Sequence, residues 1–279
     1  GSVGSSSSAI SGTVLATPGT YYLRVTGGSV TSPVAVYDLY FAVRDPADLT
    51  AETEPNDNGT PQVIPASEFV SGEINPSTDT DTFTFTANAG DTVFLSLDLD
   101  PERDVTTFNG RIGIGLFGTP ANFLVTSDAG TGDTIDSEAM VMTVATTGSY
   151  VVYVDAQVAG TGTYNFNVAK IPAPSRGTCT TYTNATPTAI ADLALTSSTI
   201  SIPDSKIIRS LRVTTDIDHA NFPDLDVHLR SPSNNDNGLF TDVGSATQTG
   251  PQVTILDDDA GLPRIFTVAN GVIWRPEGA

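Results

Sequence analysis

Two short acidic segments carry most of the side chains that could do chemistry. They are Glu52-Thr53-Glu54-Pro55-Asn56-Asp57 and Asp79-Thr80-Asp81-Thr82-Phe83-Thr84-Phe85. Together they supply five carboxylates and one Asn amide, with almost no local base to neutralise them. Crowded carboxylates repel one another, and a hard cation with oxygen ligands, above all Ca²⁺, relieves that repulsion. The alternative is a pair of solvated turns, because Asp and Asn are common turn residues.

The second acidic segment runs directly into a strand pattern that places Phe83 and Phe85 on one face. Similar period-2 alternation recurs along the chain, separated by Gly, Pro, Asn and Asp, and no stretch shows a sustained helical period. The alternating runs are 21–25, 82–85, 92–97, 111–116, 151–154, 164–168, 211–215 and 225–229. The pattern predicts an all-β chain built from tandem antiparallel β-sandwiches.

The acidic segments are part of a longer set of motifs. Glu-x-Glu-Pro-Asn-Asp at 52–57 is followed by Gly72-Glu73-Ile74, by Asp-x-Asp-x-Phe-x-Phe at 79–85 and by Ala89-Gly90-Asp91. This series, with the Gly-x-Tyr strands at 148–154 and 162–168, resembles the bacterial pre-peptidase C-terminal (PPC) domain over residues 52–170. The resemblance implies a β-sandwich appended to a secreted protease. Carried over by position from collagenase relatives, it implies Ca²⁺ ligation by Glu52, Glu54, Asn56, Asp57, Asp79 and Asp81.

The chain contains an internal repeat. Gly19-Thr20-Tyr21-Tyr22-Leu23-Arg24-Val25 matches the sequence at 148–154, and Tyr37-Asp38-Leu39-Tyr40-Phe41-Ala42-Val43 matches that at 164–170. We therefore expect residues 1–48 to be the closing strands of a first PPC-like sandwich and residues 49–170 to be a complete one. Strands without neighbours leave an open sheet edge, which an upstream segment or a partner chain would complete. Tyr21, Tyr150 and Tyr164 are expected to pack in sandwich cores.

Residues 171–187 are rich in Pro and Thr and predict an extended linker. Residues 188–279 carry a second set of motifs: Ile202-Pro203-Asp204, Asp216-Ile217-Asp218-His219, Asp224-Leu225-Asp226-Val227-His228-Leu229, Ser231-Pro232-Ser233 and Leu256-Asp257-Asp258-Asp259-Ala260. They resemble the P domain of proprotein convertases, which implies a jelly-roll-like β-sandwich. The sequence stops at Ala279 without the family's closing Gly-x-Trp strand, so we expect an incomplete copy.

The acidic residues of this third segment allow a second Ca²⁺ site. Its candidate ligands are Asp224, Asp226, Asp257 and Asp259, and the alternative is again a set of acidic turns. His219 lies just before a turn and Asp224 begins the next strand, so we expect a hydrogen bond between them that braces the turn. His228 alternates with Asp226 and Arg230 and is expected to face solvent.

Charge and composition exclude several classes of function. The net charge is −20 and the pI about 4.1, so nucleic acid and anionic membranes are not expected partners. No apolar run reaches membrane-spanning length, which argues against membrane insertion, and no signal peptide is visible. A single cysteine, Cys179, allows no intrachain disulfide, so stability must come from cores and metal. Simple solubility also accounts for the acidity.

No motif for catalysis is present. The sequence has no Gly-x-Ser-x-Gly elbow, no His-Glu-x-x-His and no Cys-x-x-Cys. Carboxylate pairs are abundant, but they fall in turns and few aromatic residues accompany them to bind sugar. We therefore predict no catalytic residue and no enzymatic activity in this region.

These observations lead to two hypotheses. In the first, the chain is a calcium-stabilised accessory region of a secreted bacterial protein, most simply a protease encoded outside this chain. It would give stability and spacing and would bind an extracellular protein or surface. In the second, it is a subunit of an extracellular filament, surface layer or adhesin, assembled with copies of itself by strand complementation. Both hypotheses place the protein outside the cell or on its surface.

Overall fold

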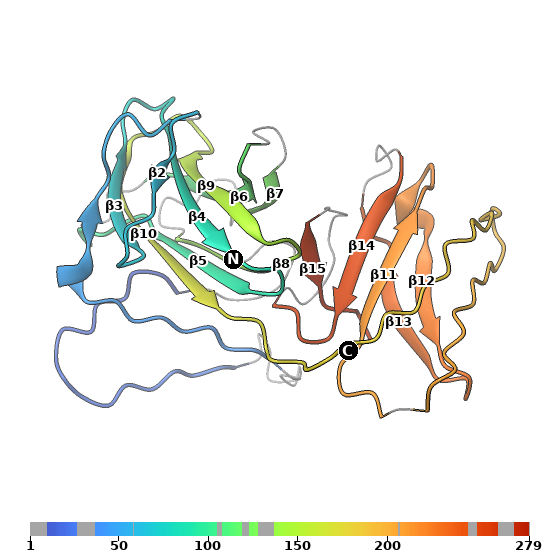
Figure 1. Cartoon of the computed structure of the whole chain (residues 1–279). Coiled ribbons are helices and arrows are strands. Elements are labelled where there is room, and N and C mark those ends of the chain that lie inside the picture. The colour runs from blue at the N-terminus through green and yellow to red at the C-terminus, as the bar shows by residue number, and fades with distance from the viewer. Residues whose placement is uncertain are drawn as a thin grey trace. The chain divides into compact units, whose positions relative to one another are not determined.

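The computed structural model describes residues 10–26, 37–57, 59–104, 108–118, 123–127, 137–205, 207–244, 250–261 and 271–278 (Figure 1). Within these residues the regular structure consists of β-strands and two one-turn 3₁₀ helices, η1 (Pro46–Asp48) and η2 (Phe222–Asp224). The predicted all-β class is confirmed. The chain divides into two compact units, the first formed mainly by residues up to 171 and the second mainly by residues from 172 onward. No helix among the described residues is long and apolar enough to cross a membrane.

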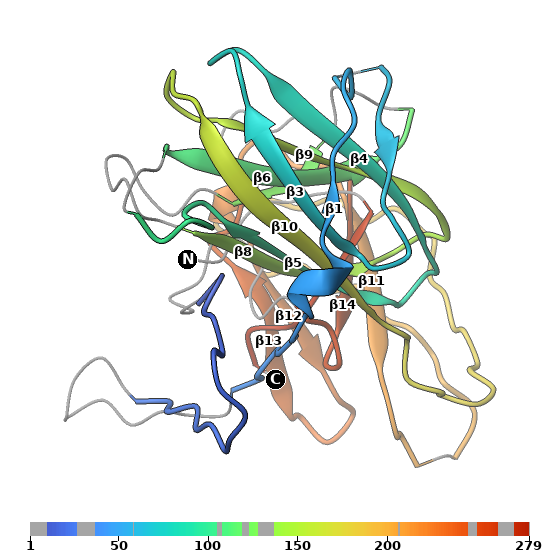
Figure 2. The same ribbon diagram turned by 90° about the vertical axis from the view of Figure 1, so that its left-hand side faces the viewer.

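The first unit contains two sheets (Figure 2). One has the spatial order β1 (Thr50–Ala51), β3 (Phe69–Ile74), β10 (Gly162–Ile171), β5 (Thr92–Asp98) and β8 (Glu138–Val144). The other has the order β2 (Gln62–Val63), β4 (Thr80–Ala87), β9 (Gly148–Ala156), β6 (Gly110–Leu116) and β7 (Phe123–Ser127). The pairs β3–β10, β4–β9, β6–β9 and β6–β7 are antiparallel, whereas the short strands β1 and β2 run parallel to β3 and β4.

The core of the first unit lies between these two sheets. Phe83 of β4 and Phe166 of β10 are both fully buried, and their rings stack with centroids 5.6 Å apart. Because the two residues belong to different sheets, this contact joins the inner faces of a β-sandwich. Phe85 stacks on Tyr150 of the neighbouring strand β9, at 5.8 Å. The predicted inward face of the strand at 82–85 is therefore confirmed.

Most of the alternating runs in the sequence form strands, but the first one does not. The runs from residue 82 onward fall in β4, β5, β6, β9, β10, β11 and β12. Residues 20–26 and 37–45 form no strand, and residues 1–9 and 27–36 of the expected first copy lie outside the described part. Tyr150 and Tyr164 are fully buried as expected, whereas Tyr21 is 52% exposed, so the described part of the chain provides no core around it. The physical reason is that a strand buries its inner face only against neighbouring strands.

The second unit contains two groups of strands. β15 (Val272–Trp274), β14 (Gln252–Asp257) and β11 (Arg212–Ile217) lie side by side, and β12 (Asp226–Arg230) pairs with β13 (Asp236–Thr241). Trp274, Leu256 and the stacked rings of Phe222 and Phe240 are buried. Residues 172–187 form no strand or helix and are largely exposed, and the linker at 171–187 remains a prediction. The resemblance of this unit to a P domain remains a prediction.

The second unit contains the two histidines, His219 and His228, and the prediction was correct for His228 only. His219 Nδ1 lies 2.7 Å from the carbonyl oxygen of Asn221, so the ring braces its turn through the backbone and not through the side chain of Asp224. The expected His219–Asp224 bond is corrected accordingly, because a carbonyl two residues away is the nearer acceptor. His228 is exposed together with Asp226 and Arg230, as predicted, and its Nδ1 lies 3.1 Å from Asp236 Oδ1.

Candidate metal centre

Strand β4 positions the second acidic segment. Asp81 lies on the same side of this strand as Phe83, so its carboxylate points into the sandwich, and the residue has no exposed surface. Asp79 precedes the strand and closes the turn before it. Its Oδ1 accepts a hydrogen bond from the backbone N–H of Thr80 (2.9 Å) and its Oδ2 accepts one from that of Asn75 (3.0 Å). The two aspartates of the Asp-x-Asp motif therefore have different surroundings.

The first acidic segment is held between β3 and β4. The backbone N–H of Glu52 donates to Ser71 O at 2.8 Å, which continues the β1–β3 pairing. The Oε1 atom of Glu52 accepts the N–H of Glu73 at 2.6 Å. On the other side, Asn56 O accepts the N–H of Thr82 at 2.9 Å. These bonds hold the first acidic segment against the start of β4, which follows it by about 25 residues along the chain.

Three carboxylates meet where these segments touch. Glu52, Glu54 and Asp81 each offer one oxygen, and these oxygens lie within 4.8 Å of one another. Among the described residues, no Lys, Arg or His forms an ion pair with any of the three. Like charges at this separation destabilise each other in the absence of a cation or a proton. The arrangement thus has an excess of negative charge that the described side chains do not neutralise.

Two buried oxygens at this place have no hydrogen-bond donor in the described part of the chain. They are Asn56 Oδ1 and Asp81 Oδ1, and both residues are fully buried. The rest of Asn56 is engaged, since its backbone N–H donates to Glu54 Oε2 (3.0 Å) and its Nδ2 donates to Glu52 Oε2 (3.3 Å). Buried acceptors are almost always satisfied in folded proteins. A cation that prefers amide and carboxylate oxygens would satisfy both atoms.

Tyr164 of β10 completes the site. Its hydroxyl lies 2.6 Å from Asp81 Oδ2 and 2.9 Å from Glu52 Oε2. A phenol has one proton to donate, so it can serve only one of the two carboxylates. Burial raises the pKa of Asp81 to about 9, against the lowering effect of the Tyr164 hydrogen bond and with further raising by the charges of Glu52 and Asp79. Burial, followed by the charge of Asp81, also raises the pKa of Tyr164 well above its usual value.

Gly72 makes room for this arrangement. It is the cross-strand partner of Tyr164 in the β3–β10 pair. A Cβ atom at position 72 would lie 2.3 Å from the Tyr164 hydroxyl oxygen and 2.4 Å from Glu52 Oε2. Both distances are far inside van der Waals contact, so any larger residue would displace the hydroxyl, the carboxylate or both.

The structure brings together four of the six residues predicted for this site: Glu52, Glu54, Asn56 and Asp81. Asp57 is exposed and contributes its carbonyl oxygen to Thr60 and Thr82, and the carboxylate of Asp79 caps its own turn. Neither carboxylate belongs to the group of three. Sequence reasoning expected only packing from Tyr164 and gave Gly72 no role. The sequence did mark both residues, since Gly72 and Tyr164 each belong to a motif on which the PPC resemblance rests.

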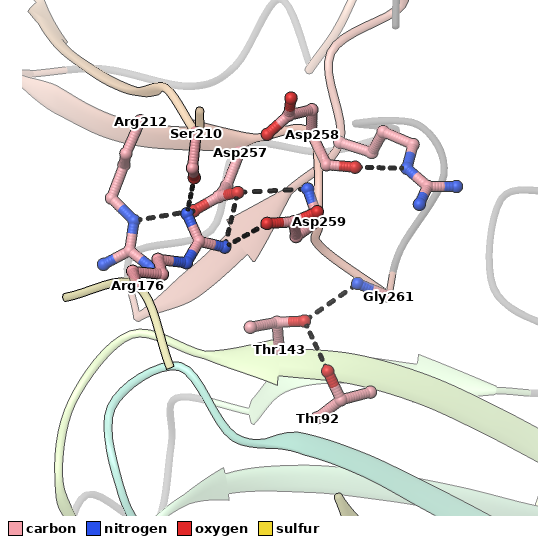
Figure 3. A network of polar contacts seen from close by, with 10 residues as sticks. Thr92, Thr143, Arg176, Ser210, Arg212, Asp257, Asp258, Asp259 and Gly261 are labelled. Atoms are coloured by element: carbon pink, nitrogen blue, oxygen red, sulfur yellow. Dashed lines mark hydrogen bonds and ion pairs between the residues drawn. The ribbon is translucent and has the colours of Figure 1, made fainter. Parts of the chain in front are cut away.

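A second acidic group, Asp257, Asp258 and Asp259, also has carboxylate oxygens within 4.8 Å of one another. Here guanidinium groups supply the positive charge (Figure 3). Arg176 lies 2.8 Å from Asp257 Oδ2 and 2.9 Å from Asp259 Oδ2, and Arg212 Nε lies 3.0 Å from Asp257 Oδ2.

The environment of this second group accounts for its charge without a metal. Burial raises the pKa of Asp257, but hydrogen bonds from Arg176, the Asp259 N–H and Arg212 outweigh it and lower the pKa below the usual range. Asp224 and Asp226, the other predicted ligands, are exposed on η2 and β12 and are not members of the group. A second cation at Asp257 would have to compete with two arginines.

Comparison with known proteins does not place this chain in a family. Neither a protein-family model nor a curated protein matches the chain. The pre-peptidase C-terminal domain of a collagenase from Bacillus anthracis is similar in structure, with 16% identity, coverage of 40% of this chain and 100% of that chain, and a TM-score of 0.29. PliG from Aeromonas hydrophila, a periplasmic inhibitor of g-type lysozyme, has 14% identity, coverage of 44% and 97%, and a TM-score of 0.28. Similarities at this level assign neither a family nor a function.

Proposed function

We propose that this chain is a non-catalytic, calcium-stabilised accessory region of a secreted bacterial protein, most simply a protease. One observation carries the proposal: within the described residues, two fully buried oxygens, Asn56 Oδ1 and Asp81 Oδ1, have no donor, and the three carboxylates beside them have no basic partner. Oxygen-only donors of this kind suit Ca²⁺ better than a transition metal, which favours nitrogen or sulfur ligands.

The cation would act as a clamp. The carboxylates of Glu52, Glu54 and Asp81 and the amide oxygen of Asn56 would hold it. The cation would favour the ionised form of Asp81, whose pKa is raised by burial and further by the charges of Glu52 and Asp79. The segment at 52–57 is attached to β4 by few backbone bonds, so a shared cation would fix it there. Millimolar calcium outside cells is sufficient for sites of modest affinity.

The role of such a region would be mechanical and adhesive. Two compact β-units can stabilise and space a neighbouring enzyme domain and present a surface to an extracellular partner. The resemblance of the motifs at 52–170 to the PPC domain supports the link to a secreted protease. The net charge of −20 supports an environment in which cations are abundant.

Calorimetric melting of the chain in calcium and in EDTA tests the clamp. We expect EDTA to lower the melting temperature of the first unit, and the double variant Asp79→Ala, Asp81→Ala to remove this sensitivity. Saturation at a thousand times the dissociation constant would stabilise the first unit by about 4 kcal/mol. The matched control is Asp224→Ala, Asp226→Ala, which removes two exposed acidic residues outside the site and should keep the calcium response. An unchanged melting curve in EDTA would reject the clamp.

A further inference from the structure

Two segments near the N-terminus repeat the two central strands of the first unit. Residues 19–25 match β9, and residues 37–43 match the middle of β10. β9 has a strand on each side, β4 and β6, and β10 likewise lies between β3 and β5. Each strand thus needs neighbours on both edges. The two repeated segments, by contrast, form no strand.

The first repeated segment exposes the side chains that its counterpart buries. In β9 the inward residues Tyr150, Val152 and Val154 are all 0% exposed. Their equivalents are Tyr21, Leu23 and Val25, which are 52%, 54% and 44% exposed. The residue types therefore suit a sandwich interior that the described part of the chain does not provide.

The second repeated segment shows the same contrast. Tyr164, Phe166 and Val168 of β10 are 0% exposed, and their equivalents Tyr37, Leu39 and Phe41 are 56%, 58% and 65% exposed. The contacts that this part of the chain does make come from other positions. Tyr40, which belongs to the opposite alternation set, stacks on Phe94 with ring centroids 6.3 Å apart, and Arg44 pairs with Glu68.

We propose that residues 19–25 and 37–43 are the last two strands of another β-sandwich, and that their partner is a sandwich of the same kind that lacks these two strands. The partner would supply neighbours equivalent to β4 and β6 for the first segment and to β3 and β5 for the second. A second copy of this chain is a poorer partner. Its sandwich already holds its own β9 and β10, whose covalent connection gives them a high effective concentration.

The repeat also defines a chemical feature of the partner. Tyr37 occupies the position of Tyr164, whose hydroxyl reaches Glu52 and Asp81. The partner is therefore a sandwich with two carboxylates at that place, which a phenol hydroxyl would complement. This step rests on the geometry of Tyr164 and not on the presence of a cation.

A core exchange within the full chain tests whether the two segments fit such a sandwich. Three substitutions, Val152→Leu, Phe166→Leu and Val168→Phe, give β9 and β10 all the inward residues of the N-terminal segments. We expect the cooperative transition to be kept with a lower midpoint, because alternation and apolar character are kept while Phe166→Leu only partly offsets the volume that the other two substitutions add. The matched control, Thr at the same three positions, should lose the transition. Loss of the transition in the exchange variant as well would overturn the proposal.

Capture of the full chain by an acceptor tests the partner itself. The acceptor is a His-tagged polypeptide of residues 50–147, co-expressed with the untagged 279-residue chain. We expect it to retain the full chain, and to retain at least tenfold less of the variant Tyr21→Asp, Leu23→Asp, Val25→Asp. The peptide 148–171 is the positive control. Retention of that peptide without the full chain would overturn the proposal, as would dimerisation of the full chain alone through these three residues. If the acceptor is insoluble even with its own strands, the core exchange decides.

Discussion

The two acidic groups of this chain look alike in sequence but have opposite electrostatic surroundings. Glu52, Glu54 and Asp81 have no basic partner among the described residues, whereas Asp257 is held by Arg176 and Arg212. The arginines come from 81 and 45 residues away along the chain. An acidic turn is therefore a weak indicator of a metal site by itself. What separates the two cases is whether the fold brings a guanidinium to the carboxylates.

The difference is visible in the most buried carboxylate of each group, Asp81 in the first and Asp257 in the second. Burial raises the pKa of Asp81 to about 9, because no cation offsets the loss of water. Burial acts in the same direction on Asp257, but the hydrogen bonds from Arg176, the Asp259 N–H and Arg212 lower its pKa overall. In the absence of metal, Asp81 is thus a neutral acid at pH 7 and Asp257 is an anion. The predictions below test this contrast.

Replacing each aspartate by its neutral isostere should give the largest difference. Asp257→Asn removes the buried partner of Arg212 and leaves Arg176 paired with Asp259 alone, so it should destabilise the second unit by about 3 kcal/mol. Asp81→Asn in EDTA replaces an already neutral acid and should change the first unit by less than about 1 kcal/mol. Chemical unfolding in EDTA measures both. A larger loss for Asp81→Asn than for Asp257→Asn would contradict the contrast, and the exposed Asp259→Asn serves as the control for lost charge.

Gly72→Ala should damage the first site through space and not through charge. Its Cβ would lie 2.3 Å from the Tyr164 hydroxyl oxygen, so we expect a loss of about 2 kcal/mol and a weaker response to calcium. The control is Gly148→Ala at the start of β9, where a Cβ would meet no atom within 4 Å. Melting of both variants with and without calcium checks the prediction. Equal behaviour of the two would show that the close approach at Gly72 is unimportant.

The two units should respond to pH with opposite signs in EDTA. The folded pKa of Asp81 is raised above 3.8, so its contribution to stability is complete below about pH 4 and is lost as the pH rises toward 9. The folded pKa of Asp257 is lowered, so its contribution is present above about pH 4 and is lost as the pH falls through the folded value. Each slope is at most about 1.4 kcal/mol per pH unit. Urea unfolding between pH 3 and 9 measures them, and first-unit stability that rises with pH would contradict the assignment.

Alternation in the sequence predicted strands well because a strand in a sandwich places every second residue in the core. Phe83, Phe166 and Val152 are buried as this rule requires. The same rule failed at Tyr21, because alternation reports how a segment would fit a sheet and not whether neighbouring strands are present. The missing information is the identity of the neighbours, which no local pattern contains.

Only part of the candidate metal site could be predicted, because the sequence shows local motifs and not long-range partners. Glu52, Glu54, Asn56 and Asp81 lie in two compact motifs, so their chemistry is visible in the sequence. The role of Tyr164 depends on its register opposite Gly72, and that of Arg176 on the path of the linker to Asp257. Both are long-range features of the fold. Residue type and spacing alone therefore could not distinguish a neutralised acidic group from one that lacks a counter-charge.

The smallest expected effect is that of Tyr164→Phe, which keeps the ring in the core and removes only the hydroxyl. In EDTA the change should cost about 1 kcal/mol, because the one hydrogen bond that the hydroxyl donates to Asp81 Oδ2 or Glu52 Oε2 is lost. In calcium the loss should be smaller, since a cation among these oxygens replaces the missing positive partner. The calcium-dependent rise in melting temperature should therefore be larger for Tyr164→Phe than for the unmodified chain. An equal loss in calcium and in EDTA would show that the hydroxyl acts independently of any cation. The first acidic group would then resemble the second in needing no metal.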